Sequence, residues 1–220
     1  MNLPFTLVVP TEVEAGYLRE HKPVICGVGS TMARRCVDDL IDEIDKGSVA
    51  TRGVVLAGFG GGLSDTLAVG DTVIPCVVTH AGDELRCGHR LVEAGRSLVT
   101  VDAVITDPAE KRSLGESSDA EVADMEGYEF ARWCTEYGLE WVILRAISDG
   151  VDDALPEPIG DWVTPEGKTK VSAALTWAGI RPGRLAELTR LKARADKAGA
   201  ALRAAVIRLA ETWPPDASPD

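Results

Sequence analysis

The sequence contains no long hydrophobic run. Its apolar stretches fall short of the roughly 20 consecutive residues that a membrane-spanning helix needs. The opening residues, MNLPFTLVVP, lack the basic start and the cleavage site of a secretion signal. These two absences favour a cytoplasmic protein.

Cysteine and histidine are few and scattered. The five cysteines are an odd number, no two of them form a C-x-x-C pair, and the three histidines are isolated from one another. Neither a disulfide framework nor a zinc site is indicated. We therefore expect reduced thiols, no bound metal and no other cofactor. The residues concerned are Cys26, Cys36, Cys76, Cys87, Cys134, His21, His80 and His89.

Three common motifs are also missing. No G-x-G-x-x-G opens a helix, no G-K-[ST] follows the glycine run, and no G-x-S-x-G elbow occurs. These absences argue against a dinucleotide-binding fingerprint, a P-loop and a serine hydrolase. Metal-free acid–base chemistry by carboxylates remains open.

Positive charge is in short supply. The chain has 23 Lys and Arg against 35 Asp and Glu, a net charge of −12. This charge would repel the phosphates of nucleic acid, so a small-molecule partner fits better. Residues 184–208 are the exception, with seven basic residues against two acidic ones. A solvated helix face is the simplest interpretation of that segment.

Short β-branched runs alternate with amphipathic segments along the chain. This alternation predicts an α/β fold with one domain over residues 1–212, in which helices flank a central, mixed but mostly parallel sheet. A long helix is expected at 184–211, a proline-rich lid or subunit-contact loop at 152–167, and a disordered tail at 213–220. The expected strands are 5–10, 22–30, 53–63, 69–80, 97–106 and 139–148, and the other expected helices are 11–20, 31–47, 107–115 and 124–138.

Three acidic residues follow predicted strands, at the edge where α/β sheets collect ligands. Glu14 follows the first strand, Glu126 lies beside Met125 at a strand-to-helix junction, and Asp149 follows the last strand. Each has a purely structural alternative. Glu14 and Glu126 could be first-turn acids of a helix, and Asp149 could cap a turn. Spacing alone leaves both interpretations open.

The run GFGGG at 58–62 is similarly ambiguous. Its glycines can form a tight turn without any ligand. They also allow the backbone to approach a flat or sugar-like ligand closely.

Taken together, these segments resemble the nucleoside phosphorylase/nucleosidase superfamily, most closely its methylthioadenosine/S-adenosylhomocysteine nucleosidase-like branch. The resemblance covers most of residues 5–155. It is carried by GFGGGLSDTLAVGDTVIP at 58–75, DMEG at 124–127 and RAISDGVDD at 145–153, and the spacing of 23 residues from Glu126 to Asp149 also matches. It implies a three-layer nucleoside phosphorylase-like fold and a purine nucleoside as substrate.

The resemblance also implies roles for these residues. The family's glutamate matching Glu126 accepts hydrogen bonds from the ribose hydroxyls, and its methionine matching Met125 packs against the sugar. The aspartate matching Asp149 protonates N7 of the purine as general acid, and Ser148 would orient it.

The acid after the first strand distinguishes hydrolysis from phosphorolysis. Nucleosidases of the family carry a glutamate there that activates water, and counting along the turn favours Glu14 over Glu12. Phosphorolytic relatives hold phosphate with arginines, and neither CGVGST nor GFGGGL supplies one, although Arg34 and Arg35 lie near the first. The resemblance therefore implies hydrolysis that releases the free base. A phosphorylase, and a non-catalytic nucleoside-binding protein on the same fold, are the alternatives.

The sequence departs from the family pattern in two places. Phe59, beside the predicted substrate-binding glycines Gly60 and Gly61, stands where many nucleosidases have a small polar residue. Residues 81–120 lack an evident aromatic clamp for the purine. Adenine is the preferred base, with hypoxanthine second, and the 5′ substituent is left open.

The end of the chain carries a narrower resemblance. Residues 153–170 and 181–206 are similar to the hopanoid-associated nucleosidases, which are thought to remove adenine from adenosylhopane. A basic amphipathic helix could then meet an anionic membrane surface. We prefer the interpretation that its leucine–alanine stripe packs on the sheet or on a partner subunit. Family members are commonly dimers or larger, and a self-association surface is expected partly from residues 150–180.

Overall fold

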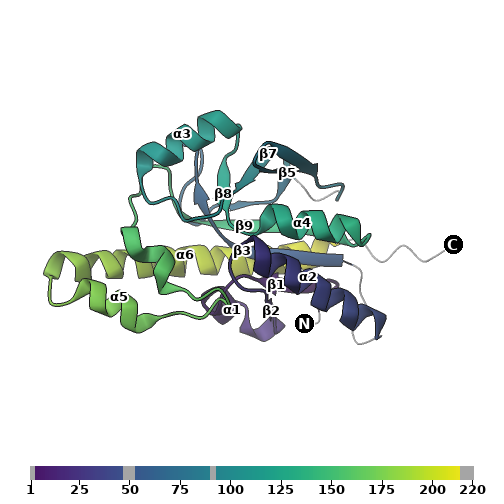
Figure 1. Cartoon of the computed structure of the whole chain (residues 1–220), viewed down its shortest axis with the longest axis horizontal. Helices are drawn as coiled ribbons and strands as arrows, with labels where there is room; N and C mark the ends of the chain where they lie inside the picture. The colour runs from purple at the N-terminus through teal and green to yellow at the C-terminus, as the bar shows by residue number, and fades with distance from the viewer. Residues whose placement is uncertain (1–2, 47–52, 90–92, 214–220) are drawn as a thin grey trace.

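The computed structural model of the chain describes residues 3–46, 53–89 and 93–213. Within these residues nine strands form one sheet of mixed sense, and helices cover both of its faces (Figure 1). Five of the strand pairings are parallel and three are antiparallel. The predicted α/β class, with a mostly parallel central sheet, is confirmed.

Strands and helices alternate along most of the chain. The strands are β1 (Thr6–Val9), β2 (Val24–Ile25), β3 (Gly53–Gly62), β4 (Thr72–Val73), β5 (Pro75–His80), β6 (Asp83–Arg86), β7 (Glu93–Thr100), β8 (Val122–Asp124) and β9 (Glu140–Asp149). The α-helices are α1 (Glu12–Tyr17), α2 (Ser30–Asp45), α3 (Pro108–Ser118), α4 (Gly127–Glu136), α5 (Val171–Ala178) and α6 (Pro182–Thr212), and the 3-10 helices are η1 (Arg19–His21) and η2 (Glu157–Trp162).

Strand β3 is the hub of the sheet. It pairs in parallel with β1 and with β9, and its last residues pair with β8 in the antiparallel sense. The carboxyl ends of β1, β3 and β9 therefore meet at one edge of the sheet, where α/β proteins collect their ligands. The remaining path runs β8-β7-β5-β6, and β4 pairs with β9.

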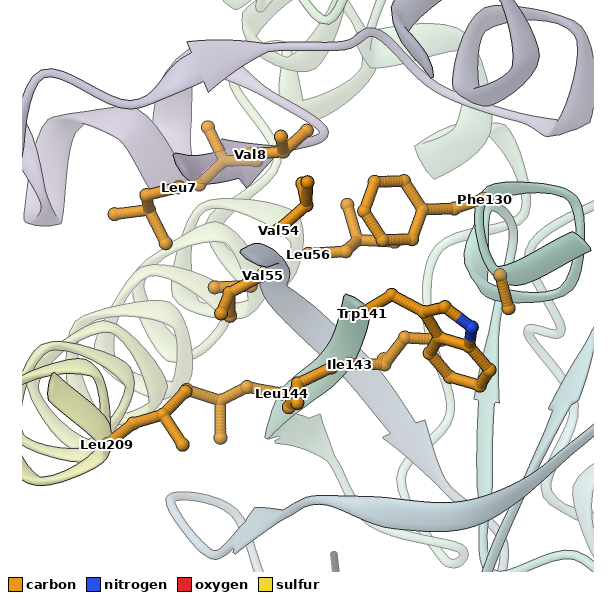
Figure 2. Packing of buried hydrophobic residues seen from close by; sticks show 14 of the residues in the cluster. Leu7, Val8, Val54, Val55, Leu56, Phe130, Trp141, Ile143, Leu144 and Leu209 are labelled. Atoms are coloured by element: carbon orange, nitrogen blue, oxygen red, sulfur yellow. The ribbon is translucent and has the colours of Figure 1, made fainter. Parts of the chain in front are cut away.

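The core lies on both faces of β3 and β9. Because successive side chains of a strand point to opposite faces, each strand contributes to two apolar layers. In Figure 2, Leu56 of β3 lies beside Phe130 of α4 on one face, and Leu144 of β9 lies beside Leu209 of α6 on the other. All four are almost fully buried. Burial on both faces explains why the sequences of β3 and β9 are continuously apolar rather than alternating.

Helix α6 serves two environments. The leucine–alanine stripe of its second half is buried against β9 and β3, which confirms the preferred packing of that part of the stripe on the sheet. Near its first turn, Leu185 is exposed. The buried residues are Ala198, Gly199, Leu202, Ala205, Val206 and Leu209.

The structure differs from the sequence-based expectations mainly in short elements. The strand expected at 69–80 is divided into β4 and β5, and the one expected at 22–30 has only two residues. The helix expected from 124 begins at Gly127, because 122–124 forms β8. Elements of two or three residues are too short to show a hydrophobic period.

The end of the chain also differs from the expected tail. Trp213 is buried, and its ring packs against Phe5 and His89. Residues 214–220 of the predicted tail lie outside the described residues. No helix of the described chain is long and apolar enough to cross a membrane.

Replacing Leu202 by Ala is expected to lower the free energy of unfolding by about 2–5 kcal/mol, because the side chain is fully buried between α6 and the sheet. The matched variant Leu185→Ala, on the exposed part of the same helix, should change it by no more than about 0.5 kcal/mol. Urea unfolding of both variants provides the measurement. Similar losses in the two variants would contradict the packing described for α6.

Candidate functional site

Glu14 lies on α1, directly after β1, and is buried while Glu12 is exposed. One carboxylate oxygen, Oε2, accepts hydrogen bonds from the N–H (2.8 Å) and the hydroxyl (2.7 Å) of Thr11, which completes a capping box. The other oxygen, Oε1, accepts the N–H of Phe59 on β3 at 2.7 Å. The helix-start interpretation is therefore correct but incomplete, since the same carboxylate also joins α1 to the glycine run.

Burial raises the pKa of the Glu14 carboxyl, and the hydrogen bonds from Thr11 and Phe59 act in the opposite direction. A carboxylate with a raised pKa is a stronger base than an exposed one. The helix that carries it is anchored to α6, because the Tyr17 ring packs where any side chain at Gly199 would clash, and the Tyr17 hydroxyl donates to Asp196.

Arg145 is the most deeply buried charged residue in the site. It lies in the middle of β9 with no exposed surface, and its guanidinium donates through Nε and Nη2 to Oδ2 of Asp124. Asp124 also accepts the hydroxyl of Thr100 at 2.7 Å and the N–H of Gly127. Among the described residues, Nη1 of Arg145 has no hydrogen-bond partner. A buried N–H without a partner is costly, so this atom is available to an incoming polar group.

Glu126 precedes the first turn of α4, but its side chain does not cap that helix. Oε1 accepts the N–H of Gly29 at 2.8 Å, and Oε2 lies 3.6 Å from Nη2 of Arg145. The first-turn interpretation of Glu126 is therefore wrong, because its contacts come from other elements. Met125, half-buried, lies between β8 and Glu126 in the chain.

The pKa of the Glu126 carboxyl is raised to about 8. Burial is the largest cause, and the nearby Asp124 carboxylate adds to it, while the Arg145 guanidinium opposes it. One guanidinium is thus shared among more carboxylates than it can neutralise.

The glycines of β3 permit these side chains to meet. A Cβ at Gly58 would lie 2.6 Å from Nη1 of Arg145 and 2.7 Å from Oε1 of Glu14. A Cβ at Gly60 would lie 2.7 Å from the side chain of Val122. All three distances are too short for a real Cβ, so close approach to neighbouring groups, rather than a tight turn, explains the run.

Asp149 ends β9 and is almost fully buried. The register between β3 and β9 shifts after Gly60, so that Gly61 pairs with Asp149 and Ser148 is bulged. The Ser148 hydroxyl donates to Oδ1 of Asp149 at 2.6 Å, as expected from the sequence. The ammonium of Lys111 on α3 donates to Oδ2. The turn-cap interpretation of Asp149 is wrong.

Asp153 has the capping role in this turn. It accepts the N–H of Gly150 at 2.9 Å, while its other oxygen pairs with Arg194 of α6. The side chain of Asp149 is therefore free of the loop that follows and faces the strand edge, with Oδ2 3.4 Å from where a Cβ at Gly61 would lie.

The structure brings Glu14 and Glu126 together around Arg145, and it places Ser148 and Asp149 against Gly60 and Gly61 of the same strand β3. Met125 precedes Glu126 in the chain. The sequence analysis missed three residues: Arg145, Asp124 and Lys111. A charged residue inside an apolar strand is itself a sign of a buried ion pair, so Arg145 could have been found. Lys111 lies in the polar segment EKRS, where nothing distinguishes it from Arg112.

The two arginines considered for phosphate binding are exposed. Arg34 lies over the ring of Trp133, with 4.2 Å from its guanidinium carbon to the ring centroid, and Arg35 is exposed beside it in the sequence. Within the described part of the chain, no three His, Cys, Asp or Glu side chains gather in a way that could hold a metal ion.

The sequence is similar to a superfamily model and to known nucleosidases. Residues 86–176 match the family model of the phosphorylase superfamily. The 5′-methylthioadenosine/S-adenosylhomocysteine nucleosidase of Shewanella halifaxensis is 24% identical over 200 residues, which cover 76% of this chain and 85% of that protein. The corresponding protein of Shewanella putrefaciens is 25% identical over 200 residues, with 76% and 84% covered.

Solved structures show the same fold. Futalosine hydrolase of Helicobacter pylori superposes with a TM-score of 0.64 at 12% identity, covering 93% of this chain and 95% of that one. A mutant methylthioadenosine nucleosidase of the same organism, with 5′-methylthioadenosine in its active site, also gives 0.64 at 14% identity, with 95% and 100% covered. The expected three-layer nucleoside phosphorylase-like fold is confirmed.

Replacing Glu126 by Gln is expected to stabilise the protein more at about pH 9 than at about pH 5, by on the order of a few kcal/mol. The folded pKa of about 8 lies above the ordinary value of 4.5, so the folded state holds this proton more tightly than the unfolded chain does. The stability that this proton gives is complete below the unfolded pKa and is lost as the pH rises through the folded pKa. Glutamine never ionises and avoids that loss.

Urea unfolding at both pH values measures the difference between the variant and the parent protein. Glu12→Gln, on the exposed side of α1, is the matched control and should show no pH-dependent gain. A Glu126→Gln effect of equal size at the two pH values would contradict the raised pKa.

Proposed function

We propose that this chain, which matches the phosphorylase superfamily model over residues 86–176, hydrolyses the N-glycosidic bond of a purine nucleoside and releases the free base, with adenine preferred. The observation that carries the proposal is the placement of two buried carboxylates along the glycine run of β3, Glu14 beside Gly58 and Asp149 beside Gly61. Two carboxylates in different surroundings can serve as base and acid of one reaction.

Glu14 is proposed as the base that activates water. Its burial, its raised pKa and its position beside the unpartnered Nη1 of Arg145 all support this role. A water molecule held between the two groups would donate to the carboxylate and accept from the guanidinium. General base catalysis of this kind contributes roughly 10²–10⁴ in rate.

The remaining residues are assigned to the sugar and the base. Glu126, next to Met125, accepts hydrogen bonds from the ribose hydroxyls, and these bonds favour its ionised form over the protonated one. Asp149, oriented by Ser148, protonates the departing purine.

The floor of the proposed substrate site is the glycine run. Gly60 and Gly61 let the sugar approach the backbone closely. Phe59 is also assigned to the proposed substrate site. Its side chain is partly exposed, and its ring centroid lies 6.1 Å from that of Tyr17.

Water is favoured over phosphate as the nucleophile. The one buried arginine near Glu14 is surrounded by carboxylates, and a phosphate placed there would meet their repulsion as well as its attraction. Arg34 and Arg35 are exposed. The phosphorylase alternative is therefore not favoured, and a non-catalytic nucleoside-binding protein would gain nothing from burying Glu14 at the cost of desolvation.

The proposal predicts base release without phosphate. The purified protein is incubated with 5′-methylthioadenosine, S-adenosylhomocysteine, adenosine and inosine, with and without phosphate, and free base is followed by chromatography. Glu14→Gln and Asp149→Asn should each lower kcat by about 10²–10⁴, because each removes one of the two proton-transfer groups. Glu12→Gln, two residues before Glu14 and exposed, should keep the parent rate.

Other outcomes have equally clear meanings. Release only in the presence of phosphate would establish a phosphorylase, and tight binding of a nucleoside without turnover would establish a binding protein. Adenosylhopane would be the next substrate to test if no small nucleoside is consumed, in keeping with the resemblance of residues 153–170 and 181–206 to hopanoid-associated nucleosidases.

We also propose that the chain forms a homodimer or larger assembly through α5. Three apolar side chains are exposed on this helix and its end: Val171 (60% exposed), Leu175 (57%) and Ile180 (95%). Val171 and Leu175 are four residues apart and so lie on one face of the helix. Such a face on a second copy of the chain would cover this one.

Light scattering tests the assembly. Leu175→Glu is expected to shift the protein from a dimer to a monomer, because it places a charge in the proposed contact. Ala204→Glu, at an exposed position of α6, is the control and should leave the assembly unchanged. A parent protein that is monomeric at working concentrations would contradict the proposal.

Contact of the basic C-terminal helix α6 with a membrane remains a prediction. At the start of α6, Arg181 and Arg184 lie near the exposed apolar residues of α5 in the chain, a combination that suits an anionic lipid surface. Co-sedimentation of a monomeric protein with vesicles that contain anionic lipid would favour membrane contact over self-association. The cytoplasmic location expected from the sequence likewise stays a prediction.

A further inference from the structure

Lys111 is a charged residue that has no role in the proposed reaction of Glu14, Glu126 and Asp149. It lies on α3 with only 1% of its surface exposed, which is rare for a lysine. Its ammonium donates to Oδ2 of Asp149, to the backbone oxygen of Gly150 at 3.1 Å and to the backbone oxygen of Asp153 at 2.9 Å. All three N–H donors of the ammonium are thus used, and one of the three acceptors is the proposed acid.

The pairing of Lys111 with Asp149 is exclusive among the nearby charges. Asp153 offers Lys111 only its backbone, since its carboxylate is held by Gly150 and by Arg194 of α6. On the same helix, Arg112 points to two other carboxylates. The other charged side chains around the pair form ion pairs among themselves. Arg194 pairs with Asp153, and Arg112 pairs with Asp65 and Asp152.

This geometry creates a requirement for the proposed acid. Both oxygens of Asp149 accept hydrogen bonds, one from Ser148 and one from the ammonium, so neither oxygen carries a proton in this arrangement. A carboxylate that accepts at both oxygens has no proton of its own to give to a leaving purine. The proton must therefore reach Asp149 from a donor that touches it.

We propose that Lys111 is a positioning residue that supplies Asp149 with the proton it delivers to the leaving base. This inference rests on the proposed nucleosidase function. It identifies the acid as a lysine–aspartate pair joined across α3 and β9.

The glycosidic bond breaks and its electron pair stays on the purine, while a proton passes from Nζ of Lys111 to the Asp149 carboxylate and from Asp149 to the purine nitrogen. Asp149 is left ionised and Lys111 is left as a neutral amine. Water adds to the sugar carbon and loses a proton to Glu14, and that proton returns to Lys111 through solvent.

The test compares two leaving groups in the full-length protein. A purine nucleoside leaves as a poor anion and needs a proton, whereas the nitrophenolate of p-nitrophenyl riboside leaves without one. Lys111→Met should lower kcat for the nucleoside by about 10²-fold or more, change KM by less than about threefold, and leave kcat for the nitrophenyl riboside near the parent value. Arg112→Met, the adjacent and exposed position, should behave like the parent protein with both substrates.

A pH profile gives a second readout that a merely structural role would not move. In Lys111→Met, kcat for the nucleoside should rise as the pH falls from about 8 to about 5, because a carboxyl can then take its own proton from solvent. Lys111→Arg, which keeps the charge, should retain more activity at neutral pH than Lys111→Met. If Lys111→Met does not fold, Lys111→Gln and Lys111→Arg make the same comparison.

Equal losses with both substrates, or profiles that run parallel to that of the parent protein, would overturn the proposal and leave Lys111 as a structural residue. If the parent protein does not cleave the nitrophenyl riboside, the pH profile alone decides. A failure of the proposed function would be seen separately, as a lack of base release by the parent protein from every purine nucleoside tried.

Discussion

The site depends on one buried guanidinium, that of Arg145. A charge with no exposed surface is tolerated only where other charges and hydrogen bonds replace water, and Asp124 supplies most of these. Glu126 and Glu14 lie close enough to feel the same charge. Because one cation cannot satisfy three carboxylates, burial dominates at the other two and their pKa values rise.

The backbone that makes this arrangement possible is β3. Its glycines have no side chain to separate the strand from its neighbours, so Glu14 can approach from α1, Arg145 from β9 and Asp124 from β8. A larger residue at Gly58 would push Glu14 and Arg145 apart. The glycine run therefore sets the distance between Glu14 and Arg145, although the glycines themselves have no reactive side chain.

The positions of the acidic site residues could largely be predicted from the sequence. Carboxyl ends of parallel strands share one edge of a sheet, so acids after separate strands were expected there, and Glu14 after β1 and Asp149 at the end of β9 both lie at that edge. Glu126 is positioned differently, because β8 runs antiparallel to β3 and pairs with Gly61 and Gly62. What could not be predicted is the direction of a side chain within a helix or a short strand. Lys111 is one polar residue among several on α3, and its burial accompanies the hydrogen bonds of its ammonium to Asp149 and to the loop after β9. β8 has three residues, too few for a hydrophobic pattern, so Asp124 was taken as the start of a helix.

Two charge clusters of different composition lie at different points of the glycine run, one beside Gly58 and the other beside Gly61. Around Arg145, three carboxylates face one cation, so that side is short of positive charge. At Asp149, a single carboxylate has a cation of its own in Lys111. When a glycosidic bond breaks, the sugar becomes positive and the departing base negative. Carboxylates near the sugar would stabilise its developing positive charge, and a proton source near the base would remove the negative charge that develops there, so both groups favour the transition state over the neutral substrate. The carboxylates around Arg145 are thus unfavourable for the stability of the free protein, and the same carboxylates suit the site to the reaction.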